Sequence, residues 1–287
     1  MSGATLALTP RFSARQYWKW VELHSATVLH LVAGPVRLLL AAPPNSDPAL
    51  HTVRAMTFAL PLTDAEIIAF ETRFKMPLSM VWGLTETCCG GTFMPLSFGR
   101  RPGYQQIGPA MIGWDVRVAD PGSVEVVPDG DIGELLVRSP GVMLGYFDDP
   151  DATERALQHG WVRSGDLGTR DRDGYFHFVD RIKDMLKPSG ENVAASEIEE
   201  VILTHPGVAE CAVIGIPDPV RTETVVAIVV PVARATVAAV ELQAFCRARL
   251  AAFKVPSVIE VRAQLPKTSI GKIRKAELRL ELSRRVV

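Results

Sequence analysis

The sequence has 287 residues, 47% of them hydrophobic, and a formal net charge of −1. This length exceeds one ordinary domain and predicts two, with ample apolar material for buried cores. The balanced charge argues against a sequence-independent nucleic-acid binder, which needs an excess of basic residues, and favours a small-molecule substrate.

Four cysteines, Cys88, Cys89, Cys211 and Cys246, have neither metal-site spacing nor the density of a disulfide scaffold. We therefore expect reduced thiols and a cytoplasmic setting. No histidine relay accompanies the adjacent Cys88 and Cys89, so a thiolate nucleophile is not expected. The N-terminus lacks the pattern of a secretion signal. The most apolar stretch, residues 27–44, is interrupted by His, Gly, Pro and Arg, which argues for buried core and against a membrane-spanning helix.

The first hundred residues predict an α/β layer. Residues 4–8 and 27–33 are apolar runs, and residues 13–23 between them have helical spacing with Ser13 as a possible N-cap. This alternation of strands and helices is typical of a parallel sheet.

A second helix is expected over residues 63–74. Thr63 can cap its first turn, and Glu66, three residues later, completes the pattern of a capping box. The helix leads directly into the segment MPLSMVWGLTE.

Residues 101–182 form short alternating segments, among them DVRVAD, GELLVRS and YFHFVDR, separated by Gly-rich turns. Such a pattern predicts antiparallel or barrel-like β structure. Asp173 and Gly174 give the clearest hairpin turn.

The last hundred residues predict a compact α+β unit. The expected elements are a helix over ASEIEEVILTH, strands at 209–216 and 223–232, a helix over 237–252 and a strand VIEVR. Ser196 and Glu199 have the spacing of a capping box for the first of these helices.

Four stretches in a fixed order carry most of the chemical information: WGLTETC (82–88), RSGDLG (163–168), DRIKDMLKPSGENV (180–193) and PKTSIGKIRK (266–275). Together they resemble the AMP-forming acyl-CoA synthetase superfamily, which are acid:thiol ligases. The resemblance extends from residue 1 to about residue 283. The segments PRFSA and GVMLGYFDDPDAT favour its acyl-CoA or carnitine-type CoA ligase branch.

The resemblance implies that a carboxylic acid is activated with ATP and Mg²⁺ to an acyl-adenylate and then transferred to coenzyme A. In WGLTE it places Trp82 over the adenine, Gly83 and Thr85 against the nucleotide, and Glu86 on Mg²⁺. The family usually has Tyr or Phe at position 82. Thr85, Glu86 and Lys272 would be the catalytic residues.

The next two motifs would bind the nucleotide and carry a hinge. Asp166 can accept both ribose hydroxyls, and Arg181 is a fork donor for ribose or phosphate oxygens. By resemblance, Lys183 is the pivot about which a C-terminal lid rotates. Gly190 would approach coenzyme A, although the family's paired glycine is replaced here by Ser189. Taken alone, each motif is more often a turn or a surface salt bridge.

The last motif would supply a cation to the reacting groups. Lys272 is a mobile point charge that can bridge the substrate carboxylate and the α-phosphate, and Gly271 lets the backbone approach closely. Without the other motifs, this basic cluster would be interpreted as a solvated helix face.

The Ser/Thr/Gly-rich phosphate loop that such enzymes carry before WGLTE does not occur in this sequence. We therefore expect the C-terminal half of a ligase of α/β and α+β class. Residues 1–182 would be part of a large adenylate-forming domain, with an α/β layer over 1–100 and a β-rich subdomain over 101–182. Residues 184–287 would be a small α+β lid, with a hinge near 183.

Three interpretations stay open at this point. The chain is a catalytically inactive fragment, or one half of a split ligase whose N-terminal half is a separate chain, or a module that binds nucleotide or coenzyme A without chemistry. All of them predict a carboxylic acid, nucleotide or thiol as the small-molecule partner, with no nucleic acid and no membrane span.

Overall fold

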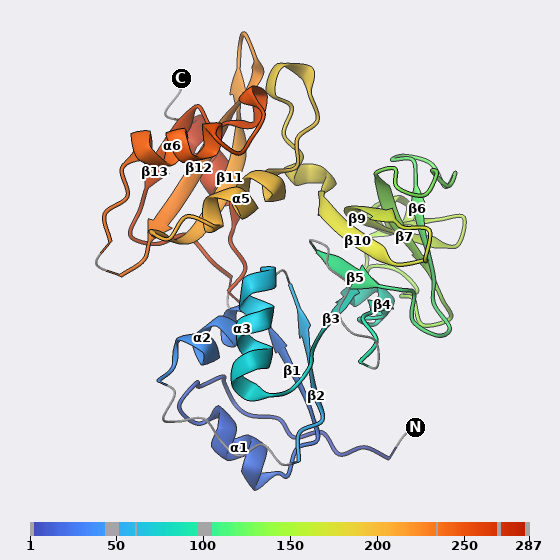
Figure 1. The fold of residues 1–287 in the computed structure, drawn as a ribbon. Helices are drawn as coiled ribbons and strands as arrows, with labels where there is room; N and C mark the ends of the chain where they lie inside the picture. The colour runs from blue at the N-terminus through green and yellow to red at the C-terminus, as the bar shows by residue number, and fades with distance from the viewer. Residues whose placement is uncertain are drawn as a thin grey trace. The chain divides into compact units, whose positions relative to one another are not determined.

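The computed structural model describes residues 3–43, 52–60, 62–96, 105–233, 235–268 and 271–284. Its internal contacts divide the chain into two compact units (Figure 1). The first unit comprises Met1–Ser164 and Gly168–Phe178, and the second comprises Gly165–Leu167 and Val179–Val287.

A four-stranded sheet in the order β1-β2-β3-β4 opens the first unit. Its strands are β1 (Val28–Val32), β2 (Ala55–Ala59), β3 (Leu78–Gly83) and β4 (Gly91–Phe93). The pairs β1/β2 and β2/β3 are parallel, and β4 pairs with β3 in antiparallel fashion. The associated helices are α1 (Tyr17–Leu23), α2 (Ala33–Ala41) and α3 (Asp64–Phe74). The expected α/β layer with parallel strands is therefore present.

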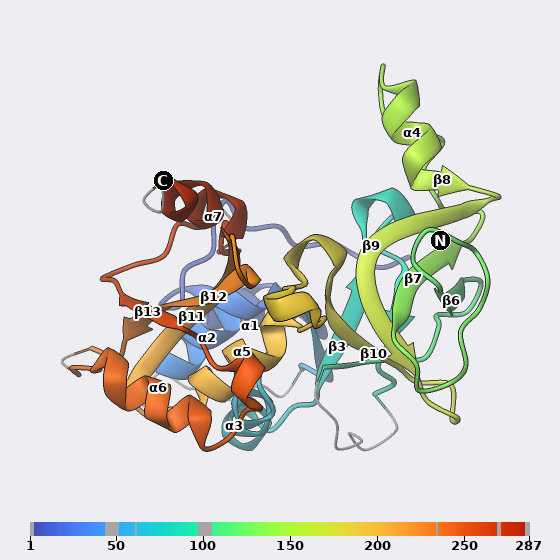
Figure 2. The ribbon, with the colours of Figure 1, turned by 90° about the horizontal axis from the view of Figure 1, so that it is seen from above.

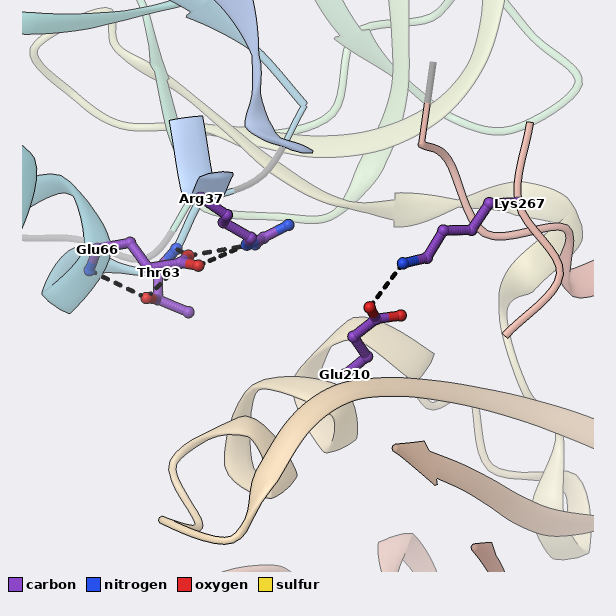
Figure 3. Close-up of polar contacts among 5 residues, drawn as sticks. All are labelled: Arg37, Thr63, Glu66, Glu210 and Lys267. Atoms are coloured by element: carbon purple, nitrogen blue, oxygen red, sulfur yellow. Dashed lines mark hydrogen bonds and ion pairs between the residues drawn. The ribbon is translucent and has the colours of Figure 1, made fainter. Parts of the chain in front are cut away.

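Helix α3 begins as the sequence predicts. The amide of Thr63 donates to Glu66 Oε2 over 2.7 Å, and the amide of Glu66 donates to Thr63 Oγ1 over 3.2 Å. Glu66 also accepts from Arg37 Nε over 2.5 Å (Figure 3). The capping box is confirmed, and the carboxylate of Glu66 also forms an ion pair with Arg37 of α2.

The N-terminal region differs from the prediction in two ways. Helix α1 starts at Tyr17, and its N-cap is Gln16 and not Ser13. The carbonyl of Ser13 accepts from the amides of Gln16 and Tyr17 and so closes a turn before the helix. Residues 4–8 form no strand, and the side chains of Leu6 and Leu8 are 78% and 80% exposed. An apolar run forms a strand only where a neighbouring strand can pair with it, and among the described residues none does so here.

A six-stranded sheet with the order β5-β10-β9-β7-β6, and β8 paired to β9, follows. Its strands are β5 (Gln106–Gly108), β6 (Asp115–Ala119), β7 (Gly133–Arg138), β8 (Leu157–Gln158), β9 (Trp161–Arg170) and β10 (Phe176–Arg181). Helix α4 (Pro150–Ala156) lies between β7 and β8 in the chain. Figure 2 shows β9 as a long, strongly curved strand. The predicted turn lies between β9 and β10, where the amide of Gly174, at φ +83°, donates to the Asp171 carbonyl.

The second unit is built on a three-stranded sheet of β11 (Val208–Asp218), β12 (Thr222–Pro231) and β13 (Val258–Val261). Alternate residues of β11 enter two different hydrophobic clusters, because successive side chains of a strand point to opposite faces. One cluster includes α5 (Ala195–Leu203) and α6 (Ala239–Arg247), and the other includes α7 (Lys275–Ser283). Helix α6 is shorter than the predicted 237–252.

The capping box predicted at Ser196 and Glu199 is wrong. Helix α5 has Ala194 as its N-cap, so Ser196 lies inside the first turn, and its amide donates instead to Asp180 Oδ2 over 3.0 Å. The hydroxyl of Ser196 donates to the Val179 carbonyl over 2.6 Å. A carboxylate sixteen residues earlier thus supplies the negative group that the helix N-terminus requires.

All four cysteines are free thiols, exposed at Cys88 and Cys89 and buried at Cys211 and Cys246. Burial raises the pKa of both buried thiols. In the part of the chain that the structure describes, no helix has the length and apolar character needed to cross a membrane.

Candidate functional site

The WGLTE segment forms a tight loop at the end of β3. The strand ends at Gly83, and Thr85–Thr87 form one 3₁₀ turn. A Cβ atom at Gly83 would lie 2.7 Å from the backbone of Cys89, so only glycine fits this close approach. The buried Thr87 closes the loop through its hydroxyl, which accepts from the Leu84 amide over 3.1 Å. The loop is therefore closed on itself by Thr87, and Thr85, Cys88 and Cys89 on it are open to solvent.

Two predicted site residues project from this loop. Thr85 is exposed and Glu86 is partly exposed. The carboxylate of Glu86 accepts a hydrogen bond from the Tyr146 hydroxyl over 2.7 Å, and its carbonyl accepts from the Met143 amide over 2.8 Å. This hydrogen bond to Glu86 raises the pKa of Tyr146. The segment around Tyr146 thus fixes the position and the orientation of Glu86.

Trp82 is largely buried. Its side chain is 6% exposed and belongs to the hydrophobic cluster that contains Ile107, Val116 and Phe176. Stacking on adenine remains a prediction for Trp82, and it would have to use the small part of the ring that is open to solvent.

In the second unit, Asp166 and Arg181 form a close ion pair. Arg181 Nε donates to Asp166 Oδ1 over 2.7 Å, with Asp166 buried and the Arg181 side chain 28% exposed. The pair joins β9 to the end of β10, two strands that are adjacent in the sheet. A guanidinium fixed by a carboxylate in this way is oriented to bind oxygens of a ribose or a phosphate.

Lys272 lies in the electrostatic environment of this pair. Partial loss of hydration lowers its pKa, the positive charges of Arg181 and Lys183 lower it further, and Asp166 and Asp184 oppose the shift. The sequence placed these residues in separate motifs. The structure brings Asp166, Arg181 and Lys272 together within one unit.

The other cations of the C-terminal motif differ from Lys272 in being paired. The ion pairs are Lys267 with Glu210, Arg274 with Glu277, Lys275 with Glu199 and Arg279 with Asp184. Lys272 forms no ion pair with any residue of the described ranges. Its ammonium group is therefore available to an anionic ligand.

The segment after Arg181 contains the two remaining predicted positions. Lys183 is exposed in a 3₁₀ turn over Ile182–Asp184, and its function as a hinge remains a prediction. Gly190 has φ +88°, and the preceding Ser189 is also left-handed, at φ 55°. Glycine adopts this conformation without strain and serine does not, so the serine at 189 has an energetic cost in the backbone.

The structure thus places the predicted residues in two groups, one in each unit. Trp82, Gly83, Thr85 and Glu86 belong to the first unit, and the second unit contains Asp166, Arg181, Lys183, Gly190 and Lys272. Sequence reasoning missed Tyr146, which is 60 residues from Glu86 and gives no local signal.

Magnesium has one candidate protein ligand in this arrangement. Among the described residues there is no cluster of three or more His, Cys, Asp or Glu side chains that could hold a metal. Mg²⁺ in nucleotide sites is usually bound by one or two carboxylates together with substrate phosphates and water, and Glu86 fits that pattern. Oε1 of this carboxylate accepts from the Tyr146 hydroxyl, and metal binding by Glu86 remains a prediction.

Residues 1–147 match the AMP-binding enzyme family, and residues 197–272 match the AMP-binding enzyme C-terminal domain. The chain belongs to the AMP-binding enzyme family. A crotonobetaine/carnitine–CoA ligase of Proteus mirabilis is 39% identical over 284 residues, covering 96% of this chain and 54% of the relative. The chain therefore spans about half the length of the curated relatives it matches.

Solved structures of AMP-binding enzymes agree with this assignment. ATP-bound MatB from Rhodopseudomonas palustris has a TM-score of 0.87 and 32% identity, covering 96% of this chain and 54% of that one. O-succinylbenzoate coenzyme A synthetase (MenE) from Bacillus subtilis, in complex with ATP and magnesium, has a TM-score of 0.82 and 27% identity, covering 93% and 54%. The predicted superfamily and fold class are confirmed.

Proposed function

We propose that this chain carries the C-terminal half of an AMP-forming acid:CoA ligase, which activates a carboxylic acid as an acyl-adenylate and transfers the acyl group to coenzyme A. The observation that carries the proposal is Lys272, which has no ion-pair partner among the described residues and lies in the field of the Asp166–Arg181 pair. An ammonium group in this setting is suited to a substrate in which negative charges accumulate.

The proposed first step joins the acid to the nucleotide. A carboxylate oxygen attacks the α-phosphorus of ATP, and the bond to the β-phosphate oxygen breaks, so pyrophosphate leaves with the bonding electrons. Lys272 would stabilise the negative charge shared between the carboxylate and the α-phosphate. Asp166 and Arg181 would orient the ribose, which places the α-phosphate within reach.

In the second step, the thiol of coenzyme A gives its proton to solvent and its sulfur attacks the acyl carbonyl, and the bond from the acyl carbon to the AMP phosphate oxygen breaks, so AMP leaves with the bonding electrons. We propose that the loop around Gly190 approaches the thiol-bearing arm. The left-handed Ser189 and the buried Pro188 support a stiff loop at this position.

ATP and Mg²⁺ are the proposed cosubstrate and metal. Mg²⁺ would neutralise charge on the phosphates, and Glu86, held by Tyr146, would be its carboxylate ligand. Support comes from the solved relatives, because MatB is bound to ATP and MenE to ATP and magnesium.

For the acid, we propose a small carboxylate of the kind named for the relatives. The sequence favours the carnitine-type branch, and the curated relatives include crotonobetaine/carnitine–CoA ligases. Carnitine, crotonobetaine and o-succinylbenzoate therefore form the first panel to test. A cytoplasmic setting remains a prediction of the sequence.

We further propose that activity requires the residues which the relatives carry outside the matched half. The edge strand β1 supports this, because in the described residues it pairs only with β2, and Val28 on it is 54% exposed. The exposed Leu6 and Leu8 give the same indication. An unpaired edge next to apolar side chains is suited to receive a further strand. The occupant we expect is the polypeptide that corresponds to the N-terminal half.

The test measures acid-dependent release of pyrophosphate from the purified chain with ATP, Mg²⁺ and the acid panel, with and without a co-expressed N-terminal half of a relative. We expect release only when the second half is present. Release by the chain alone would show that the second half is dispensable. Nucleotide binding without turnover in both cases would replace the proposal by a binding module.

A further inference from the structure

Lys272 is carried by a short hairpin in the second unit. Lys267 and Ile273 face each other in an antiparallel bridge, and the amide of Arg274 donates to the Pro266 carbonyl over 2.9 Å. Nearer the tip, the amide of Thr268 donates to the Lys272 carbonyl over 2.8 Å, and the amide of Lys272 donates to Thr268 Oγ1 over 3.1 Å. The backbone of Lys272 is thus fixed within the hairpin, but the hairpin itself needs an anchor.

The two ends of the hairpin are held by ion pairs. On one side, Lys267 Nζ lies 2.6 Å from Glu210 Oε1, with side chains 38% and 34% exposed (Figure 3). On the other side, Lys275 Nζ lies 2.7 Å from Glu199 Oε1, with side chains only 16% and 18% exposed. Solvent screens an exposed pair strongly and a protected pair weakly, so the attraction in the second pair is less screened.

The Glu199 anchor is tied to the sheet as well. Glu199 Oε1 accepts from the Val213 amide in β11 over 2.7 Å, and Lys275 is also attracted by Asp180. Burial raises the pKa of Glu199, and the nearby Lys275 opposes that shift. Burial alone would lower the pKa of Lys275, but Glu199 and Asp180 outweigh it, and its pKa is raised. Each partner therefore favours the charged form of the other, although burial leaves the pKa of Glu199 raised overall.

Lys275 is the first residue of α7, and Lys272 precedes it by three residues. Leu278 and Leu282 bury the same helix against Ile214 and Ile216 of the strands. A helix fixed at its first residue by an ion pair and along its length by apolar packing gives the preceding residues little freedom. The position of the Lys272 backbone follows from the position of Lys275.

We propose that Lys275 and Glu199 are positioning residues that hold the Lys272 hairpin for the adenylation step. This inference rests on the proposed function for its kinetic consequence, but the positioning itself is a property of the chain alone. Neither residue needs to touch a substrate. Lys267 and Glu210 form the more exposed anchor of the same hairpin.

The experiment compares Lys275→Met and Glu199→Gln with the conservative Lys275→Arg, using Arg274→Met as a control. Arg274 is adjacent to Lys275, but its pair with Glu277 is exposed, at 56% and 55%. The assays are ATP/pyrophosphate exchange, thioester formation from supplied acyl-adenylate, and amide hydrogen exchange at Thr268, Gly271 and Lys272. A thermal melt of each variant measures whether the fold survives.

We expect Lys275→Met to lower adenylation by about 100-fold, the effect of displacing a catalytic group by roughly 1 Å. Thioester formation from supplied adenylate should change by less than about threefold, because only the first step uses Lys272. The hairpin amides should exchange faster, and Lys275→Arg should restore both adenylation and protection. Arg274→Met should behave as the unmodified chain.

Equal loss in both half-reactions, or unchanged protection of the hairpin amides in Lys275→Met, would overturn the inference. If the unmodified chain shows no adenylation even with the N-terminal half supplied, the proposed function fails. Hydrogen exchange then still decides whether Lys275 and Glu199 fix the hairpin. If Lys275→Met does not fold, Glu199→Gln and Lys275→Arg supply the same comparison.

Discussion

The hydroxyl of Tyr146 donates a 2.7 Å hydrogen bond to Oε1 of Glu86. A carboxylate that holds a metal is oriented by such partners, and their removal typically weakens metal affinity by about 10-fold or more. We therefore expect Tyr146→Phe to raise the Mg²⁺ concentration needed for half-maximal adenylation about 10-fold, with a smaller effect at saturating Mg²⁺. A Mg²⁺ titration of pyrophosphate release measures it.

The matched control is Phe147→Leu, because Phe147 is fully exposed next to Tyr146. It should leave the Mg²⁺ titration unchanged. Equal Mg²⁺ requirements in Tyr146→Phe and the unmodified chain would show that the hydrogen bond does not orient Glu86 for the metal.

Glu86→Gln removes the charge that we assign to Mg²⁺. We expect a larger increase in the Mg²⁺ requirement than in Tyr146→Phe, since an amide oxygen is a much weaker ligand for a hard dication than a carboxylate. The same Mg²⁺ titration measures the change. Unchanged metal dependence in Glu86→Gln would remove Glu86 from the site.

Lys272→Ala should lower adenylation by about 10²- to 10³-fold, the usual effect of removing one group that stabilises developing charge. Thioester formation from supplied acyl-adenylate should be spared. Comparable losses in the two half-reactions would count against the function assigned to Lys272.

Lys272 also predicts a pH dependence. Its pKa lies below the ordinary lysine value, so the ammonium group loses its proton as the pH rises through that lowered pKa. Adenylation should fall on the alkaline side at a lower pH than an ordinary lysine would give. In Lys272→Arg the group stays charged, so this alkaline fall should disappear from the pH profile. An unchanged alkaline limb in Lys272→Arg would assign it to another group.

Glu66 predicts a pH-dependent contribution to stability. Burial tends to raise its pKa, but Arg37 and the hydrogen bonds with Thr63 outweigh burial, and the pKa in the folded chain is lowered. The carboxylate therefore contributes stability above its ordinary pKa of 4.5, and this contribution is lost as the pH falls through the lower, folded value. Glu66→Gln should reduce the free energy of unfolding by about 1 kcal/mol at neutral pH.

Urea unfolding at neutral and acid pH measures this effect. The difference between Glu66→Gln and the unmodified chain should shrink in acid. Glu22→Gln, on the exposed surface of α1, should show no difference at either pH. A difference for Glu66→Gln that persists at the lowest pH would point to altered packing in place of lost charge.

Substitutions at the left-handed residues Ser189 and Gly190 should change the stability of the fold in opposite directions. Both residues have positive φ, and a Cβ at Gly190 would have no heavy atom within 4 Å, so backbone strain alone decides the outcome. Gly190→Ala should destabilise the chain by about 1 kcal/mol, and Ser189→Gly should stabilise it by up to about 1 kcal/mol. Chemical denaturation measures both, and a destabilised Ser189→Gly would show that the serine side chain contributes more than the strain costs.

Local signals in the sequence were sufficient wherever the interacting groups are near neighbours. The capping box of Thr63 and Glu66 was predicted correctly because its two partners lie within one helical turn. The turn at Asp173 and Gly174 was predicted for the same reason. The strands of the second unit also follow the sequence closely, since a run of apolar residues with β-branched side chains is a strong signal at the centre of a sheet.

The predicted capping box at the start of α5 fails because distant residues compete for the same groups. Ser196 and Glu199 have the spacing of a capping box, yet Asp180 accepts from the Ser196 amide and Lys275 pairs with Glu199. Local spacing cannot reveal a partner that the fold brings from elsewhere in the chain. The hydrogen bond between Tyr146 and Glu86 was missed for the same reason.

The sequence by itself determined the family, the order of the motifs and the types of residue available for nucleotide chemistry. It did not distinguish Lys272 from Lys275, two lysines three residues apart in the same basic cluster. The tertiary structure paired Lys275 with a protected carboxylate and left Lys272 without an ion pair among the described residues. The reason is physical: whether a lysine stabilises the fold or remains available to a substrate depends on which carboxylates the packed chain places within about 4 Å of its ammonium group.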